Sequence, residues 1–197
     1  MAVVLTAAPA AEPISLAEPI SLAEAKAHLR IDAGDEDALL TALITAARMF
    51  IERTLGLALV TQSWSYFLDF WPRAGCITPP ILPVQLVGTV KVHDGAGGSV
   101  TLDAASYAAD VVSEPARLVL KGAVPATQAR ELNAFEVDFT AGYGDEADDV
   151  PGPIRHALKL LVAHWFERRE VVVLGLGAQE VPATVAGLLL PYRRVRL

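Results

Sequence analysis

Two side chains near the end of the chain have a spacing that is found in metal sites. His164 and Glu167 lie three residues apart on a predicted helix, and this spacing places a histidine and a carboxylate on one helix face, as in carboxylate-bridged metal centres. Acidic residues that precede the same helix could add oxygen ligands: Asp145, Glu146, Asp148 and Asp149. One hypothesis is therefore a small metal-dependent hydrolase that uses His164, Glu167 and this acidic cluster.

Other patterns argue against catalysis. A carboxylate-bridged centre needs further carboxylates from other helices, whereas the other predicted helices present leucine, isoleucine and alanine on their inner faces. The acidic cluster lacks the alternate spacing of a calcium loop and suits the positive start of a helix. Cys76 has no candidate base near it in sequence, and neither a G-x-S-x-G motif nor a P-loop is present. We predict that the protein is not an enzyme and has no metal or cofactor.

A second group of residues is suited to binding. Residues 171–178 are apolar, and three leucines at positions 188–190 precede a basic tail. Apolar segments of this kind mark interaction surfaces when they are exposed. We predict a docking segment at Leu188 and Leu189, followed by a partner contact through the tail residues Tyr192, Arg193, Arg194 and Arg196. The alternative is that the last helix only covers the core and the tail is solvated.

The charge of the chain is unevenly distributed. The 197 residues have a net charge of −7, yet residues 171–197 carry three basic residues and one acidic residue. The tail is therefore +2, and residues 1–170 carry −9. This balance excludes a protein that grips nucleic acid over its whole surface. One cysteine excludes an internal disulfide, and prolines interrupt the longest uncharged stretch, residues 74–90, so no membrane helix is predicted.

Hydrophobic periodicity predicts the elements that position these residues. Ser21 and Glu24 form a capping box at the start of a helix over residues 21–31. A longer helix follows over residues 35–55 and stops at Gly56. Alternating residues then predict several strands, and helical patterns return for a helix that begins near Pro151 and for a short helix over residues 182–190. The strands are expected at residues 63–70, 85–93, 99–102, 107–112, 117–121 and 135–140.

The order of these elements predicts an α+β fold, mainly a helical bundle that carries an inserted small antiparallel β domain. Residues 21–59 and 143–197 form the helical core with its C-terminal tail, and residues 60–142 form the inserted domain. Residues 1–20 precede the first predicted helix and include most of a direct repeat of AEPISL, which spans residues 11–22. Because Pro13 and Pro19 favour extended chain, we interpret this segment as a flexible arm.

Short motifs follow one another in a specific order along the chain, at residues 21–32, 35–37, 39–53, 80–84, 107 with 110, 115–118, 135–144, 151–155, 165 with 167–169, and 189–193. In this order they resemble the head–tail connector (adaptor) proteins of tailed phages, a family also found in prophages and gene transfer agents. The resemblance covers residues 20–197. The repeat at residues 11–22 departs from the family pattern.

The resemblance implies a structural function. Family members form rings, usually of twelve copies, that connect the portal protein to a tail-side stopper or terminator protein while DNA passes through the lumen without sequence-specific binding. The chain would then reside at the head–tail junction of the virion, or in the bacterial cytoplasm before assembly. Leu188 and Leu189 become candidates for the ring interface, and the tail becomes a candidate portal contact. A third hypothesis is a generic soluble interaction module. In a ring, the acidic body would line a channel to which DNA does not adhere.

Overall fold

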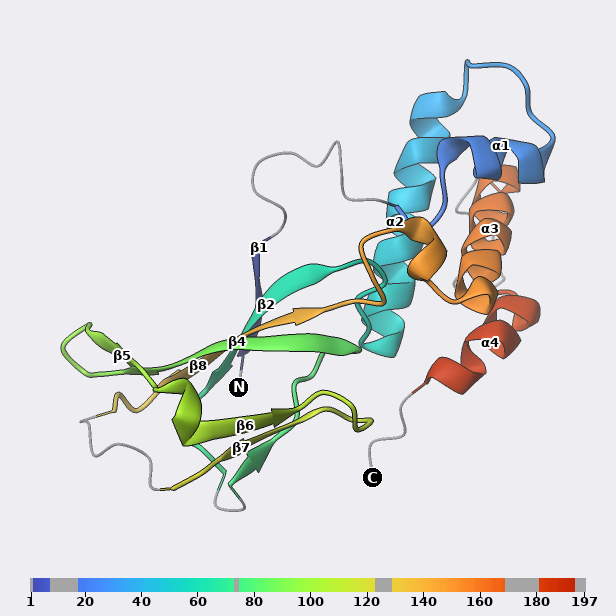
Figure 1. Ribbon diagram of the computed structural model, residues 1–197. Coiled ribbons are helices and arrows are strands. Elements are labelled where there is room, and N and C mark those ends of the chain that lie inside the picture. The colour runs from blue at the N-terminus through green and yellow to red at the C-terminus, as the bar shows by residue number, and fades with distance from the viewer. Residues whose placement is uncertain (1, 8–17, 73–74, 123–128, 169–180, 194–197) are drawn as a thin grey trace, which may run out of the picture. The chain divides into compact units, whose positions relative to one another are not determined.

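The chain divides into two compact units (Figure 1). The computed structural model describes residues 2–7, 18–72, 75–122, 129–168 and 181–193. The strand unit contains Gly56–Tyr143 and a strand at Ala2–Ala7. The helical unit contains the described residues of Ser15–Leu55 and Gly144–Leu197. The predicted α+β fold class is confirmed, although strands contribute more to the fold than "mainly helical" implies.

The helical unit is built around one central helix. Its described α-helices are α1 (Leu22–Leu29), α2 (Asp37–Leu55), α3 (Gly152–Glu167) and α4 (Ala183–Leu189), and α3 packs against the other three. The predicted capping box is confirmed, because Ser21 Oγ accepts the Glu24 N–H at 3.1 Å and Glu24 accepts the Ser21 N–H at 2.9 Å. None of the helices in the described ranges is long and apolar enough to cross a membrane.

The strand unit contains two antiparallel sheets. Five strands form the larger sheet in the order β1-β2-β8-β4-β5, and three form the smaller one in the order β3-β7-β6. The larger sheet consists of β1 (Ala2–Ala7), β2 (Gln62–Leu68), β8 (Phe135–Ala141), β4 (Val84–His93) and β5 (Ser99–Thr101), and the smaller one of β3 (Cys76–Ile77), β7 (Arg117–Leu120) and β6 (Tyr107–Asp110). In the larger sheet β8 is the central strand, paired with β2 and β4.

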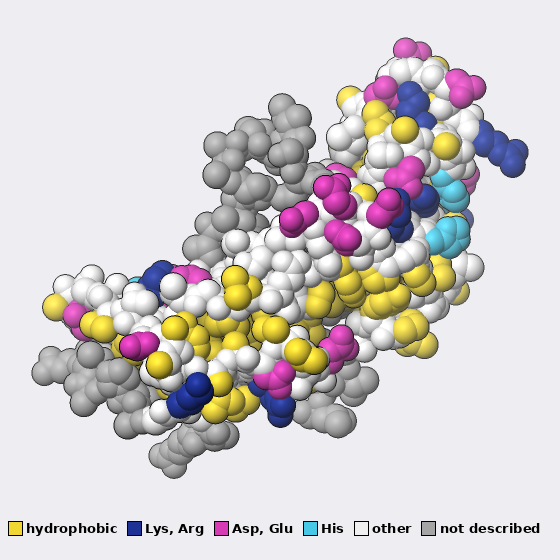
Figure 2. Space-filling model, viewed as in Figure 1, with side chains coloured by type: hydrophobic (Ala, Val, Ile, Leu, Met, Phe, Trp, Pro, Cys, Tyr) yellow, Lys and Arg dark blue, Asp and Glu magenta, His cyan; other side chains and the backbone are white. Residues whose placement is uncertain are grey.

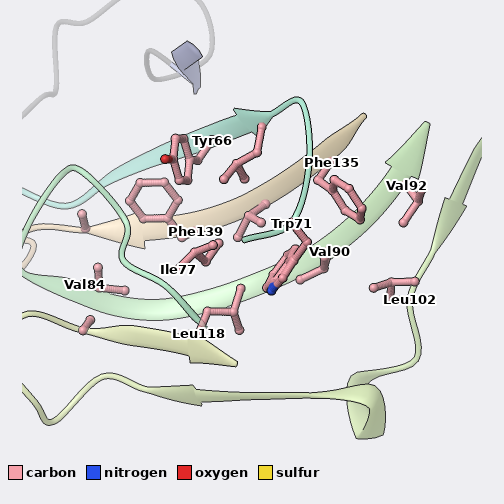
Figure 3. Close-up of a cluster of buried hydrophobic side chains, with 14 of the residues drawn as sticks. Tyr66, Trp71, Ile77, Val84, Val90, Val92, Leu102, Leu118, Phe135 and Phe139 are labelled. Carbon is pink, nitrogen blue, oxygen red and sulfur yellow. The ribbon is translucent and has the colours of Figure 1, made fainter. Parts of the chain in front are cut away.

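Side chains from both sheets share one hydrophobic core (Figure 3). Along β8 every second residue is buried, which is the pattern of a strand with one face on the core. Phe135 of β8 stacks edge-to-face with Trp71, with ring centroids 5.6 Å apart, while Leu118 of β7 reaches the same cluster and is fully buried. The two sheets are therefore held together by apolar packing between their inner faces.

Three features differ from the sequence prediction. Residues 1–20 are predicted to be a flexible arm, yet Ala2–Ala7 forms β1 beside β2. The β-branched residues of Ala2–Ala7 favour a strand. The prolines that suggested an arm, Pro13 and Pro19, come later in the chain. The two-residue strand β3 is too short for an alternating pattern to reveal. The predicted strands at 63–70 and 107–112 end at Leu68 and Asp110.

Candidate functional site

The predicted metal ligands do not come together. His164 and Glu167 both lie near the end of α3, but the Nε2 atom of His164 is buried without a hydrogen-bond partner among the described residues, whereas Glu167 is exposed. Within the described ranges no group of three histidine, cysteine, aspartate or glutamate side chains could hold a metal ion. The hydrolase hypothesis therefore has no ligand set in this part of the chain.

The acidic cluster instead organises the turn before α3. The Asp149 carboxylate accepts the Glu146 N–H at 3.0 Å, and Asp148 forms an ion pair with Arg155 on the first turns of α3. Asp145, Glu146, Asp148 and Asp149 are all exposed. Acidic side chains gather over this part of the helical unit in Figure 2. A carboxylate-rich turn at a helix N-terminus is favoured by the helix dipole, so the cluster has a structural explanation.

Glu24 connects two helices that are distant in sequence. Besides its cap hydrogen bonds, its carboxylate accepts hydrogen bonds from Arg155 and from Lys159, each at 2.9 Å. Burial alone would raise the pKa of Glu24, but the hydrogen bonds from Lys159 and the Ser21 N–H, with the positive charges of Lys159 and Arg155, lower the pKa to about 2. Arg155 also donates to the Pro19 carbonyl oxygen at 3.0 Å. This junction therefore joins the start of α1 to α3.

A polar network covers the outer face of the larger sheet. Lys91 on β4 donates to Glu136 at 3.0 Å and to Asp138 at 2.8 Å, both on β8. The pKa of Lys91 is raised by its hydrogen bonds to Asp138 and Glu136. Burial would raise the pKa of Asp138, but hydrogen bonds from Lys91, Ser65 and Thr89 outweigh it and lower the pKa. The opposite charges therefore compensate each other within the sheet.

The same network borders a shallow depression of about 330 Å³, and the contacts of its histidine and serine can be compared with those of a catalytic triad. His93 Nε2 lies 2.7 Å from Glu136, whereas Ser65 Oγ donates to Asp138. The imidazole and the hydroxyl therefore contact different carboxylates, and this is not a serine–histidine–carboxylate relay. Sequence reasoning missed both this network and the Glu24 junction. The polar residues that alternate along β4 and β8 were the available signal for the network.

The C-terminal candidates lie in different environments. Leu189 is 4% exposed and packs inside its own unit, Leu188 is half-buried, and the next residue, Leu190, is 63% exposed. Tyr192 is half-buried in a short 3-10 turn, and Arg193 is exposed. Arg194, Arg196 and the apolar segment at residues 171–178 lie outside the described residues. Cys76 is a free, half-buried thiol in β3.

Known proteins with a similar sequence or structure indicate what kind of protein this chain is. The chain resembles a protein in the neck of an empty GTA particle, with 27% identity and a TM-score of 0.78 over 100% of this chain and 97% of that one. A model of the phage gp6-like head–tail connector protein family matches residues 19–92. The chain is similar to head–tail connector proteins.

Two further solved structures resemble this chain. One is a chain in the virion of a native gene transfer agent particle, 27% identical, with a TM-score of 0.74 over 94% of this chain and 96% of that chain. The other is in the neck of a native GTA particle computed with C12 symmetry, 28% identical, with a TM-score of 0.73 over 94% of this chain and 95% of that one. No curated protein matches this chain in sequence. The resemblance predicted from the ordered motifs is confirmed, and the similarities support a structural connector.

Proposed function

We propose that the chain forms a ring in the neck of a phage-like particle, between the portal protein and a tail-side stopper or terminator protein. The observation that carries this proposal is the similarity over the whole length of both chains to a protein of a GTA particle neck. A similar chain belongs to a neck computed with C12 symmetry, which supports a ring of twelve copies. The chain would reside in the virion after assembly.

Two surfaces are assigned within this proposal. Arg193 is exposed directly after the last described turn, and we assign it to the portal contact together with Tyr192, Arg194 and Arg196. Leu188 remains a candidate for the ring interface because it is only half-buried in its own chain. Leu189 already packs inside the helical unit, so its contribution to a ring would be indirect. We propose that these contacts are structural and that the protein catalyses no reaction.

The acidic body supports a channel to which DNA does not adhere. Asp145, Glu146, Asp148 and Asp149 are exposed on the helical unit, and we propose that this cluster faces the lumen of the ring. Phosphates gain no counterion-release affinity from a surface of their own sign. Replacing these four residues with lysine should slow DNA passage in an ejection assay. A basic lumen in the assembled ring would contradict this assignment.

The proposed function is tested by removing the chain from particle-producing cells. Without it, we expect DNA-filled heads that carry no tails in electron micrographs, and a plasmid copy of the chain should restore tailed particles. The empty plasmid is the matched control. Normal numbers of tailed particles without the chain would overturn the proposal.

A further inference from the structure

The outward face of α2 carries no charge over its first half. Residues 38–47 contain no acidic or basic side chain. The buried face of α2 is formed by Leu40, Ile44, Ala47, Ile51 and Leu55. At about 100° per residue, the opposite side of the helix presents four apolar residues, which we call the α2 stripe: Leu39, Ala42, Ala46 and Met49. All four are exposed, with Leu39 at 36% and Met49 at 42%.

Arg48, next to Met49 in sequence, is turned away from solvent, whereas the exposed Arg53 lies one turn beyond Met49 and marks the end of the stripe. Arg48 is only 13% exposed, and it donates to Glu18 at 2.9 Å and to Glu52 at 2.8 Å. A surface helix in a monomer ordinarily directs its charged residues outward, and a helix that is apolar on all sides is ordinarily covered. The α2 stripe therefore has the composition of a covered surface.

A second stripe of matching spacing lies on α4. Val185 and Leu189 form the buried face of this helix, and its outward side presents Ala183, Ala186 and Leu190, all exposed. We call these three residues the α4 stripe. Residues 181–192 contain no charge, and hydrophobic side chains gather around α4 on the face shown in Figure 2. Because α2 and α4 both bury their inner faces in a unit where α3 packs against each of them, both stripes point away from α3.

We propose that the α4 stripe of one copy packs on the α2 stripe of the next copy. The two spacings agree when the helices run antiparallel, because positions 42, 46 and 49 then face positions 190, 186 and 183. Leu190 then meets Ala42, Ala186 meets Ala46 and Ala183 meets Met49, so each large side chain faces a small one and the two surfaces can interdigitate.

Charge complementarity supports the antiparallel orientation. In this orientation the exposed Arg193 lies opposite position 39 of the neighbour, about one helical turn from the exposed Asp35 that precedes α2. Arg193 then contacts the next copy, and Tyr192, Arg194 and Arg196 are left for the portal contact. When two different patches of identical copies meet head to tail, the copies form a closed ring if the rotation from each copy to the next adds up to a full turn. The inference therefore deepens the proposed function and rests on the ring that it assumes.

Cross-linking between two single-cysteine proteins tests the pairing. Both carry Cys76→Ser; one carries Ala42→Cys and the other Leu190→Cys. Mixed at high concentration without portal and treated with a short bismaleimide, they should give a covalent dimer several-fold more abundant than either protein alone gives. Ala27→Cys, at an exposed position of α1 outside both stripes, replaces Ala42→Cys in the control mixture. Equal dimer yields from the two mixtures would overturn the pairing.

An arginine substitution tests the same surface without cross-linking. Ala46→Arg should abolish self-association in sedimentation velocity and reduce tailed particles at least tenfold, whereas the matched Ala27→Arg should leave both unchanged. The orientation predicts that Asp35→Arg weakens self-association and that Arg193→Asp restores it in the double variant. If Ala46→Arg supports wild-type numbers of tailed particles, the interface is refuted while the ring proposal stands. Tailed particles without any connector would refute the ring itself.

Discussion

Replacing Glu24 with glutamine tests how strongly one carboxylate joins α1 to α3. The carboxylate is 32% exposed and forms ion pairs with Arg155 and Lys159. Its pKa falls from 4.5 to about 2 in the folded protein, which corresponds to about 3 kcal/mol at 1.36 kcal/mol per pKa unit. Because solvent screens a carboxylate that is a third exposed, we reduce this to about 1–2 kcal/mol. Glu24→Gln should lower the free energy of unfolding by that amount at neutral pH.

The sign of the pH dependence follows from the direction of the pKa change. A carboxylate whose pKa is lowered by folding stabilises the folded state above its unfolded pKa, and this contribution is lost as the pH falls through the folded pKa. The difference between wild type and Glu24→Gln should therefore be constant above a pH of about 4.5 and shrink towards a pH of about 2.

Urea unfolding followed by circular dichroism at the helical wavelength measures this difference. Glu167→Gln is the matched control, because Glu167 lies exposed at the end of α3 and its substitution should leave the unfolding free energy nearly unchanged. Equal destabilisation by Glu24→Gln at neutral pH and at a pH of about 2 would refute the electrostatic reasoning. An effect of the same size from Glu167→Gln would show that the loss is not specific to the junction.

Three further predictions concern the strand unit and the tail. Leu118→Ala should cost about 2–5 kcal/mol of stability, measured by urea unfolding, because the side chain is fully buried in the core shared by the two sheets. Gly142→Ala should lower the melting temperature strongly, since φ is +144° and a Cβ would lie 2.6 Å from the Thr61 backbone nitrogen. Deletion of residues 192–197 should weaken portal capture in a pull-down while leaving the circular dichroism spectrum unchanged.

Each of these predictions has its own control. Val112→Ala, at a position that is 91% exposed, should be nearly neutral where Leu118→Ala is costly. Gly97→Ala separates conformational strain from steric overlap, because Gly97 also has a positive φ but nothing lies within 4 Å of an added Cβ. For the tail, undiminished portal capture by the truncated chain would remove residues 192–197 from the portal contact.

Local signals in the sequence were sufficient for much of the fold. The capping box at Ser21 and the stop at Gly56 involve residues close to one another, so the helix boundaries followed from them. The strand predicted at residues 135–140 is β8, because alternation with a period of two is a local property. In contrast, β3 has only two residues, and such a short strand forms only because β7 lies beside it.

The sequence by itself indicated the class of protein and contained neither a G-x-S-x-G motif nor a P-loop. The order of motifs over residues 20–197 was enough to predict the similarity to head–tail connectors, because several weak motifs in a fixed order are more specific than any one of them. Only the tertiary structure decided which charges meet. Glu24 and Lys159 are 135 residues apart, and Lys91 and Asp138 are 47 apart. The exposure of Leu190 beside the buried Leu189 was also a tertiary result, because the burial of a side chain depends on which helix packs against it.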